Sequence, residues 1–217
     1  MLMIEEREKI VEFGKKLITD GLTTGTGGNI SIFNKELGYF AISPSGIDYF
    51  KTKVEDIVIM DLDGKIIEGE KKPSSEHEMH RYVYLNHPQA GATVHCHSTY
   101  ATVLSTLRMD LPASNYIIAD AGDKVVKCSR YETFGTKELA QASMEAMGQR
   151  RACLQANHGQ LTWGKDIESA FNLAMTLEQL CKIHVISLSA GKPQIIEDEK
   201  MDEVLEKFKT YGQKKRD

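Results

Sequence analysis

The apolar residues near the start of the chain recur every three or four positions between residues 4 and 20. They are Ile10, Phe13, Leu17 and Ile18. Such spacing puts them on one face of an amphipathic helix, and Gly21 can close that helix in a left-handed conformation. The pattern therefore predicts an opening helix with one buried face.

After Gly21 the apolar residues alternate with polar ones, which is typical of strands with one buried face. Residues 30–32 alternate in this way, and residues 39–42 are of types that favour strands. Residues 57–60 and 65–67 are joined through Asp63-Gly64, a dipeptide that favours a tight hairpin turn. This part of the chain is expected to form antiparallel strands.

From residue 73 onward, helical and strand-like patterns follow one another. Ser75 and Glu78 match a capping box, which predicts a helix that begins at the turn 73–75 and has Glu76 in its first turn. Further helices are expected near 100–107, 136–147, 166–189 and 201–208, and strands near 92–97, 114–118, 124–128 and 152–156. This interleaving predicts a three-layer α/β/α sandwich around a central mixed, largely antiparallel sheet.

Composition adds limits on the class of protein. With 217 residues, 41% hydrophobic and 27% charged, a single domain over residues 1–217 is expected. The formal net charge of −4 gives no electrostatic reason to expect nucleic acid or an anionic membrane as a partner, so a small molecule is favoured. The four cysteines lie far apart, and neither a secretion signal nor a bilayer-long apolar segment is visible. We therefore expect reduced thiols and a cytoplasmic location.

His95 and His97 are the first candidates for chemistry, because alternate residues of a strand point to the same face. Two imidazoles on one face could bind one metal ion, although two unrelated histidines on a partly buried strand would give the same pattern. Ser98 is a plausible N-cap for the next helix, which would put the pair at a strand end that faces a cleft.

A zinc site needs about four ligands, so other side chains would have to complete the set. His158 is the best third candidate, since it follows a strand-like run and precedes Gly159, whose missing side chain would let another group come close. Glu76 is a candidate fourth ligand, while a glutamate that only favours the helix dipole is the alternative. The remaining histidines are interpreted as helix or loop residues; they are His77, His80, His87 and His184.

Glycines and hydroxyl residues form a second group of candidates, in residues 25–29, 43–46 and 74–75. Turns and helix starts of this kind offer N–H and O–H donors to an anion, so together they could hold a phosphate. Residues 25–28 match neither a Walker loop nor a dinucleotide fingerprint, and as separate turns the three segments could be structural only.

Taken together and in order, these segments resemble the zinc-dependent class II aldolase/adducin family. The segments are 25–31, 43–47, 73–76, 95–97, 131–136, 158–159 and 206–212. The resemblance covers nearly the whole chain and is closest to the members that cleave L-fuculose 1-phosphate. It implies an aldolase that cleaves a ketose 1-phosphate to dihydroxyacetone phosphate and an aldehyde such as L-lactaldehyde, through a metal-stabilised enediolate.

The resemblance also implies roles for individual residues. Zinc, or another divalent ion, would be bound once per subunit by Glu76, His95, His97 and His158. The substrate phosphate would be held by Thr26, Gly28, Asn29, Ser45, Gly46, Ser74 and Ser75. Glu76 would also act as general acid/base, and Tyr116 or Tyr211 would move the proton of the C4 hydroxyl. Phe134 and Phe208 would shape the aldehyde side, and the sites would lie at the subunit interfaces of a homotetramer.

Other functions within the family stay open. A pentulose-phosphate 4-epimerase would be expected to carry an acidic residue where Asn115 stands, and an amide cannot donate that proton. A methylthioribulose-phosphate dehydratase, an aldolase for a different deoxyketose phosphate and a metal-free, adducin-like interaction domain are the further alternatives. Ser45, where threonine is usual, keeps a hydroxyl, and Asn157 stands where a histidine is usual.

Overall fold

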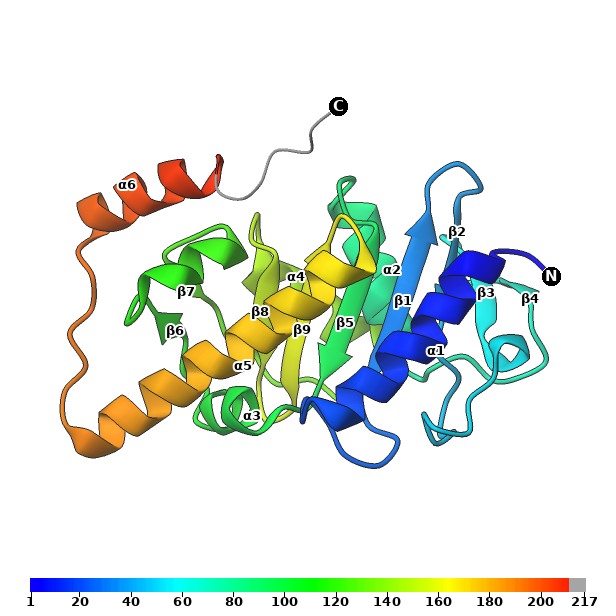
Figure 1. Ribbon diagram of the computed structural model, residues 1–217, viewed down its shortest axis with the longest axis horizontal. Coiled ribbons are helices and arrows are strands. Elements are labelled where there is room, and N and C mark those ends of the chain that lie inside the picture. Colours follow the sequence, from blue (N-terminus) through cyan, green and yellow to red (C-terminus); the bar gives the residue numbers. More distant parts are fainter. Residues whose placement is uncertain (211–217) are drawn as a thin grey trace.

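A computed structural model describes residues 1–210. Its centre is a seven-stranded sheet of order β4-β3-β2-β1-β5-β9-β8, in which every neighbouring pair of strands is antiparallel (Figure 1). The strands are β1 (Asn29–Asn34), β2 (Tyr39–Ile42), β3 (Val58–Asp61), β4 (Ile66–Glu68), β5 (Ala92–Cys96), β8 (Ala152–Gln155) and β9 (Gly159–Gly164). A separate pair is formed by β6 (Leu111–Pro112) and β7 (Val125–Val126).

Helices cover both faces of the sheet (Figure 1). The helices α1 (Ile4–Thr19) and α5 (Ile167–Ala190) pack on one face, and α2 (His77–Asn86) and α4 (Lys137–Met147) pack on the other. The third buried cluster lies around α3 (Thr99–Thr106), α6 (Asp198–Phe208) and the 3-10 helix η2 (Tyr116–Ala121); a shorter 3-10 helix, η1, spans Val54–Asp56. The predicted three-layer sandwich is confirmed, and the parallel component is the isolated bridge between Cys128 and Leu154.

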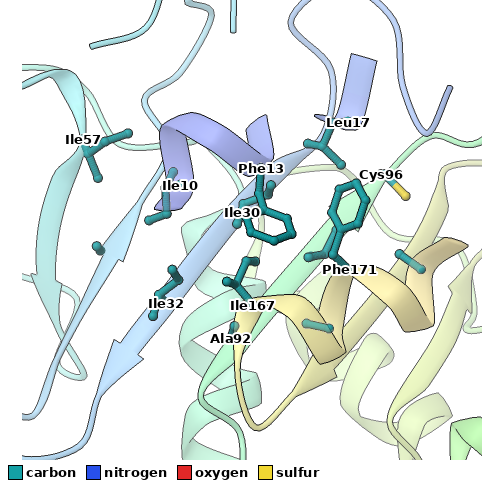
Figure 2. Packing of buried hydrophobic residues seen from close by; sticks show 14 of the residues in the cluster. Ile10, Phe13, Leu17, Ile30, Ile32, Ile57, Ala92, Cys96, Ile167 and Phe171 are labelled. Carbon is teal, nitrogen blue, oxygen red and sulfur yellow. The ribbon is translucent and has the colours of Figure 1, made fainter. Parts of the chain in front are cut away.

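The opening helix buries the face that its sequence pattern predicts. Phe13 of α1 meets Phe171 of α5 edge to face, with ring centroids 5.2 Å apart, above Ile30 of β1 and Cys96 of β5 (Figure 2). This packing holds both helices against β1, which begins at Asn29, and against β5, which carries His95. The central sheet is therefore anchored where the site lies.

The predicted start of α2 is one residue too early. The helix begins at His77, Glu76 occupies its N-cap position, and Ser75 makes no capping hydrogen bond. The reason is a tertiary pairing: the N–H of Ser74 donates to the carbonyl of Ser43, and an isolated bridge joins Pro44 to Pro73. These contacts hold residues 73 and 74 in an extended pairing. Glu76 is therefore the N-cap residue of the helix and does not belong to its first turn.

The predicted strand near 114–118 is also wrong, because residues 116–121 form the 3-10 helix η2. The side chain of Asn115 accepts a hydrogen bond from the N–H of Ile117 and starts this helix, which a strand pattern does not anticipate. The strand β9 was not predicted, although it forms the sheet's link between β5 and β8. Its polar residues Gln160 and Thr162 are buried and hydrogen-bonded to α5, so they hide the apolar pattern of a central strand.

Gly159 allows β9 to approach β5 closely. A Cβ atom at this position would collide with the carbonyl oxygen of Cys96, so the predicted close approach is confirmed. Among the described residues no helix is both long enough and apolar enough to cross a membrane.

Candidate metal centre

Four side chains from three parts of the chain meet at one end of the sheet. Glu76 comes from the start of α2, His95 from β5, His97 from the residue after Cys96, and His158 from the turn between β8 and β9. One ligand atom from each lies within 4.8 Å of the others. Nε2 of His95 is 2.9 Å from Nε2 of His97 and 3.3 Å from Oε2 of Glu76, and Nε2 of His158 is 3.3 Å from Oε1 of Glu76.

Each histidine ring directs its Nε2 atom toward another member of the cluster. Nδ1 of His95 donates to the carbonyl oxygen of Gln160 at 2.9 Å, which fixes the ring and leaves Nε2 free to bind an ion. Burial, reinforced by the nearby His95, lowers the pKa of His97 to about 4 and that of His158 to about 3. Both rings are therefore neutral near pH 7, as metal ligands must be.

The Glu76 carboxylate is held ionised. Burial alone would raise its pKa, but His95, His158 and the amide of Asn29 together keep the pKa below its ordinary value. Nδ2 of Asn29 donates to Oε2 at 3.0 Å, whereas Oε1 is buried and accepts no hydrogen bond from the described part of the chain. A buried, unsatisfied carboxylate oxygen is costly unless a cation occupies the site.

The residues present therefore fit a divalent metal ion. Three neutral imidazoles and one carboxylate are a donor set that suits zinc, and the hydrogen bonds on His95 and Glu76 are of the kind that orients metal ligands. The spacing of their ligand atoms lets one ion reach all four.

The cluster borders a cleft of about 430 Å³. The cleft is lined by every residue that the resemblance assigns to phosphate: Thr26, Gly28, Asn29, Ser45, Gly46, Ser74 and Ser75. No lysine or arginine of residues 1–210 lines it, so an anion there would rely on neutral donors, the start of α2 and the metal.

Gly28 lines the cleft and lies against the backbone of His95, with φ at +71°. A Cβ atom there would be 2.8 Å from the carbonyl oxygen of His95, which is backbone and cannot move away cheaply. Only glycine meets both conditions without strain.

We expect Gly28→Ala to destabilise the fold by more than the backbone conformation alone costs and to weaken metal binding, because it pushes β1 away from His95. Gly38→Ala is the matched control, since Gly38 also has φ at +71° but has no atom near the added Cβ. The control should cost about 1 kcal/mol in unfolding free energy and keep metal affinity. Urea unfolding and metal titration of both variants measure the difference, and equal losses would contradict the explanation.

The other predicted residues lie in two places. Phe134 is 66% exposed and lines the same cleft as the candidate ligands Glu76, His97 and His158. Tyr116, which is 53% exposed, and Phe208 of α6 instead line a second cavity of about 640 Å³, away from the metal cluster. Tyr211 lies outside the described residues.

Several residues of the site were not predicted individually. Tyr131, Glu132 and Asn157 also line the cleft, although the first two belong to a segment that carried the family resemblance. His80, interpreted from the sequence as a helix or loop histidine, is fully buried and bonded to Asn29. Its position four residues after Glu76, on the same helix face, was the available signal.

A sandwich fold with three histidines and one carboxylate clustered beside a cleft of glycines and hydroxyl residues is typical of a metal-dependent enzyme, and comparison with known families agrees. The sequence matches the family described as Class II Aldolase and Adducin N-terminal domain over residues 8–185. The chain belongs to this family.

Three similar proteins carry the name of an aldolase. The 5-deoxy-D-ribulose 1-phosphate aldolase of Bacillus thuringiensis serovar kurstaki is 50% identical over 213 residues, which span 98% of this chain and 100% of the relative. The L-fuculose phosphate aldolase of Escherichia coli K12 is 39% identical over 88% of each chain. A solved structure of an L-fuculose 1-phosphate aldolase superposes with a TM-score of 0.92 at 46% identity, covering 94% of this chain and 96% of the other. The predicted lyase is confirmed at this level.

Proposed function

We propose that this chain is a zinc-dependent aldolase that cleaves the C3–C4 bond of a deoxyketose 1-phosphate, with 5-deoxy-D-ribulose 1-phosphate as the first candidate. The products would be dihydroxyacetone phosphate and acetaldehyde. The observation that carries the proposal is the position of Glu76 and the three histidines at one end of a cleft lined with phosphate-type donors. The relative that is 50% identical over its whole length supports the choice of substrate.

L-Fuculose 1-phosphate, the substrate implied by the sequence resemblance, is the second candidate. The structure that shares 46% identity and the Escherichia coli relative favour it. Both sugars share the dihydroxyacetone phosphate half and differ only in the aldehyde half. Phe134, at the exposed rim of the cleft, is therefore the residue that we expect to contact the part that differs.

The residues of the chain divide the work. Backbone N–H groups and hydroxyls around Ser45, Ser74 and Ser75 would bind the phosphate, and the start of α2 adds partial positive charge. A divalent ion bound by Glu76 and the three histidines would supply a Lewis acid that draws electrons from the breaking bond. Glu76, ionised and open to the cleft, would move the proton at C3, and a tyrosine would take the proton of the C4 hydroxyl.

The tyrosine would come from a neighbouring subunit. Tyr116 and Phe208 share a cavity that is separate from the metal cleft, and Tyr116 is 53% exposed, which supports contact with the cleft of another copy. We therefore retain the homotetramer with sites at subunit interfaces as part of the proposal. A single domain over residues 1–217 and a cytoplasmic location complete it, and the described cysteines, all unpaired, fit a reducing compartment.

A retro-aldol assay tests the proposal. Purified protein is incubated with 5-deoxy-D-ribulose 1-phosphate, L-fuculose 1-phosphate or L-ribulose 5-phosphate, with and without a chelator, and release of dihydroxyacetone phosphate is measured. We expect release from the 1-phosphates, fastest from the first, and none from L-ribulose 5-phosphate. Epimerisation of L-ribulose 5-phosphate without cleavage of the other two, or cleavage that the chelator leaves unchanged, would refute the proposal.

A further inference from the structure

Behind the metal cluster, five buried polar side chains form an unbroken series of hydrogen bonds. Nδ2 of Asn29 is 3.0 Å from Oε2 of Glu76, and Oδ1 of Asn29 is 2.5 Å from Nε2 of His80. Nδ1 of His80 is 2.7 Å from Oγ of Ser31, which is 2.5 Å from the hydroxyl of Tyr84. The roles proposed above use neither His80 nor Ser31 nor Tyr84.

The local geometry of two elements produces this series. Glu76, His80 and Tyr84 are spaced by four residues, so they lie on one face of α2, from its N-cap to its last turn. Asn29 and Ser31 are spaced by two residues and share one face of β1. Packing of this helix face on this strand face brings all five side chains together. Each is at most 6% exposed.

The direction of every hydrogen bond follows from the carboxylate. Glu76 can only accept, so Asn29 must turn its NH₂ group toward it and its oxygen toward His80. That oxygen needs a donor, which requires the neutral ring of His80 to carry its proton on Nε2. Nδ1 then accepts from the hydroxyl of Ser31, and Tyr84 donates to Ser31. A flipped amide would instead bring the oxygen of Asn29 against the carboxylate.

His80 is chemically suited to hold one fixed orientation. It has no exposed surface, and burial lowers its pKa to about 3, so the ring stays neutral near pH 7. A buried neutral imidazole with a different partner on each nitrogen has a single favourable tautomer. Its ring therefore acts as a rigid donor toward Asn29.

We propose that His80 is a positioning residue for the metal centre, because its Nε2–H group locks the amide of Asn29 in the orientation that holds the Glu76 carboxylate toward the three histidines. Asn29 also lines the cleft, so the same lock fixes a side chain shared by the metal end and the phosphate end of the site. The expected effect of His80 on kcat rests on the proposed function. Its expected effect on metal binding does not.

Two amide variants separate this role from a general structural one. Gln at position 80 puts an NH₂ group near the place of Nε2 and keeps the donor to Asn29, whereas Asn reaches only the place of Nδ1. Each keeps one of the two buried hydrogen bonds of His80 and loses the other. We expect His80→Asn to weaken Zn²⁺ binding by about 10–100-fold and to lower kcat by a similar factor. Both quantities should stay within about 3-fold of the wild type in His80→Gln. Similar losses in both variants would overturn the proposal.

The measurements are chelator competition for the Zn²⁺ dissociation constant, kcat and KM with 5-deoxy-D-ribulose 1-phosphate, and the midpoint of thermal unfolding. His87→Gln is the control for loosening of α2, since His87 is the C-cap of this helix, is buried against Trp163 and lies outside the series. We expect His87→Gln to lower the unfolding midpoint and to leave the Zn²⁺ affinity unchanged. A loss of Zn²⁺ affinity equal to that of His80→Asn would show that a looser helix is sufficient, which would overturn the proposal.

A spectroscopic test is independent of catalysis. In protein labelled with ¹⁵N-histidine, the His80 signals are assigned by their loss in His80→Gln. We expect a neutral ring with the proton on Nε2 in both the metal-free and the Zn²⁺-loaded protein. A proton on Nδ1, or a charged ring at neutral pH, would overturn the proposal. If the tautomer and the Zn²⁺ affinities agree but no sugar phosphate is cleaved, the positioning role stands and the proposed function alone fails.

Discussion

Glu76→Gln is expected to lower kcat by about 10²–10⁴-fold, the range in which general acid–base groups contribute. The glutamine side chain has nearly the same shape, and its oxygen can still accept the hydrogen bond from Nδ2 of Asn29. It cannot accept or return a proton at C3, and it is a weaker metal ligand than a carboxylate. Because the donors around Ser45 and Ser75 are untouched, binding of inorganic phosphate should survive within about 3-fold.

Dihydroxyacetone phosphate release, zinc content and phosphate binding are measured on the same preparation. Zinc content matters, because a variant that has simply lost its metal would also be inactive. Glu78→Gln is the matched control: Glu78 lies on the same helix, pairs with Arg81 and does not line the cleft. We expect near-normal turnover from this control. Near-normal turnover of Glu76→Gln would refute its role as the proton-moving group.

Removal of the metal is expected to reduce turnover by at least about 100-fold and also to lower thermal stability. Without an ion, Oε1 of Glu76 stays buried without a hydrogen bond, and the neutral rings of His97 and His158 lie within 4.8 Å of the same group of ligand atoms. An ion present at 100 times its dissociation constant should stabilise the fold by about 2.7 kcal/mol. For a chain of this length that corresponds to a rise of about 5–10 °C in the unfolding midpoint.

Thermal unfolding with chelator and with added Zn²⁺ measures this effect, and turnover is followed in parallel. His158→Ala should abolish the metal-dependent rise, because it removes one of the four ligands. His184→Ala is the control, since His184 bonds to Ser114 and is not part of the metal cluster. A wild-type midpoint that Zn²⁺ does not change, or turnover that survives complete chelation, would contradict the metal centre.

Local patterns in the sequence predicted most elements for physical reasons that need no tertiary contact. The periodicity of Ile10, Phe13 and Leu17 predicted α1, and the Asp63-Gly64 turn predicted the hairpin of β3 and β4. Where prediction failed, long-range contacts were responsible. The pairing of Ser74 with Ser43 moves the start of α2 to a later residue than the sequence predicts. Gln160 and Thr162 are polar but buried against α5, so β9 lacks the apolar pattern of a central strand.

The metal centre was predictable to different degrees from its parts. Strand alternation alone pointed to His95 and His97, because both the pattern and the chemistry are local. His158 and Glu76 were only candidates until the family resemblance joined them, since nothing local links residues that are about eighty positions apart. The structure brings their ligand atoms within 4.8 Å of those of the histidine pair.

Hydrophobic periodicity, turn chemistry and ordered motifs were thus enough to establish the layered fold, the family and the identity of the metal-ligand candidates, because each depends on residues close in sequence or on their order. The direction in which the Glu76 carboxylate points, the hydrogen bonds of Asn29 and His80 that hold it, and the separation of Tyr116 from the cleft became visible only in the folded chain. These features arise where a helix face packs on a strand face, and that packing depends on contacts between residues that sequence order does not bring together.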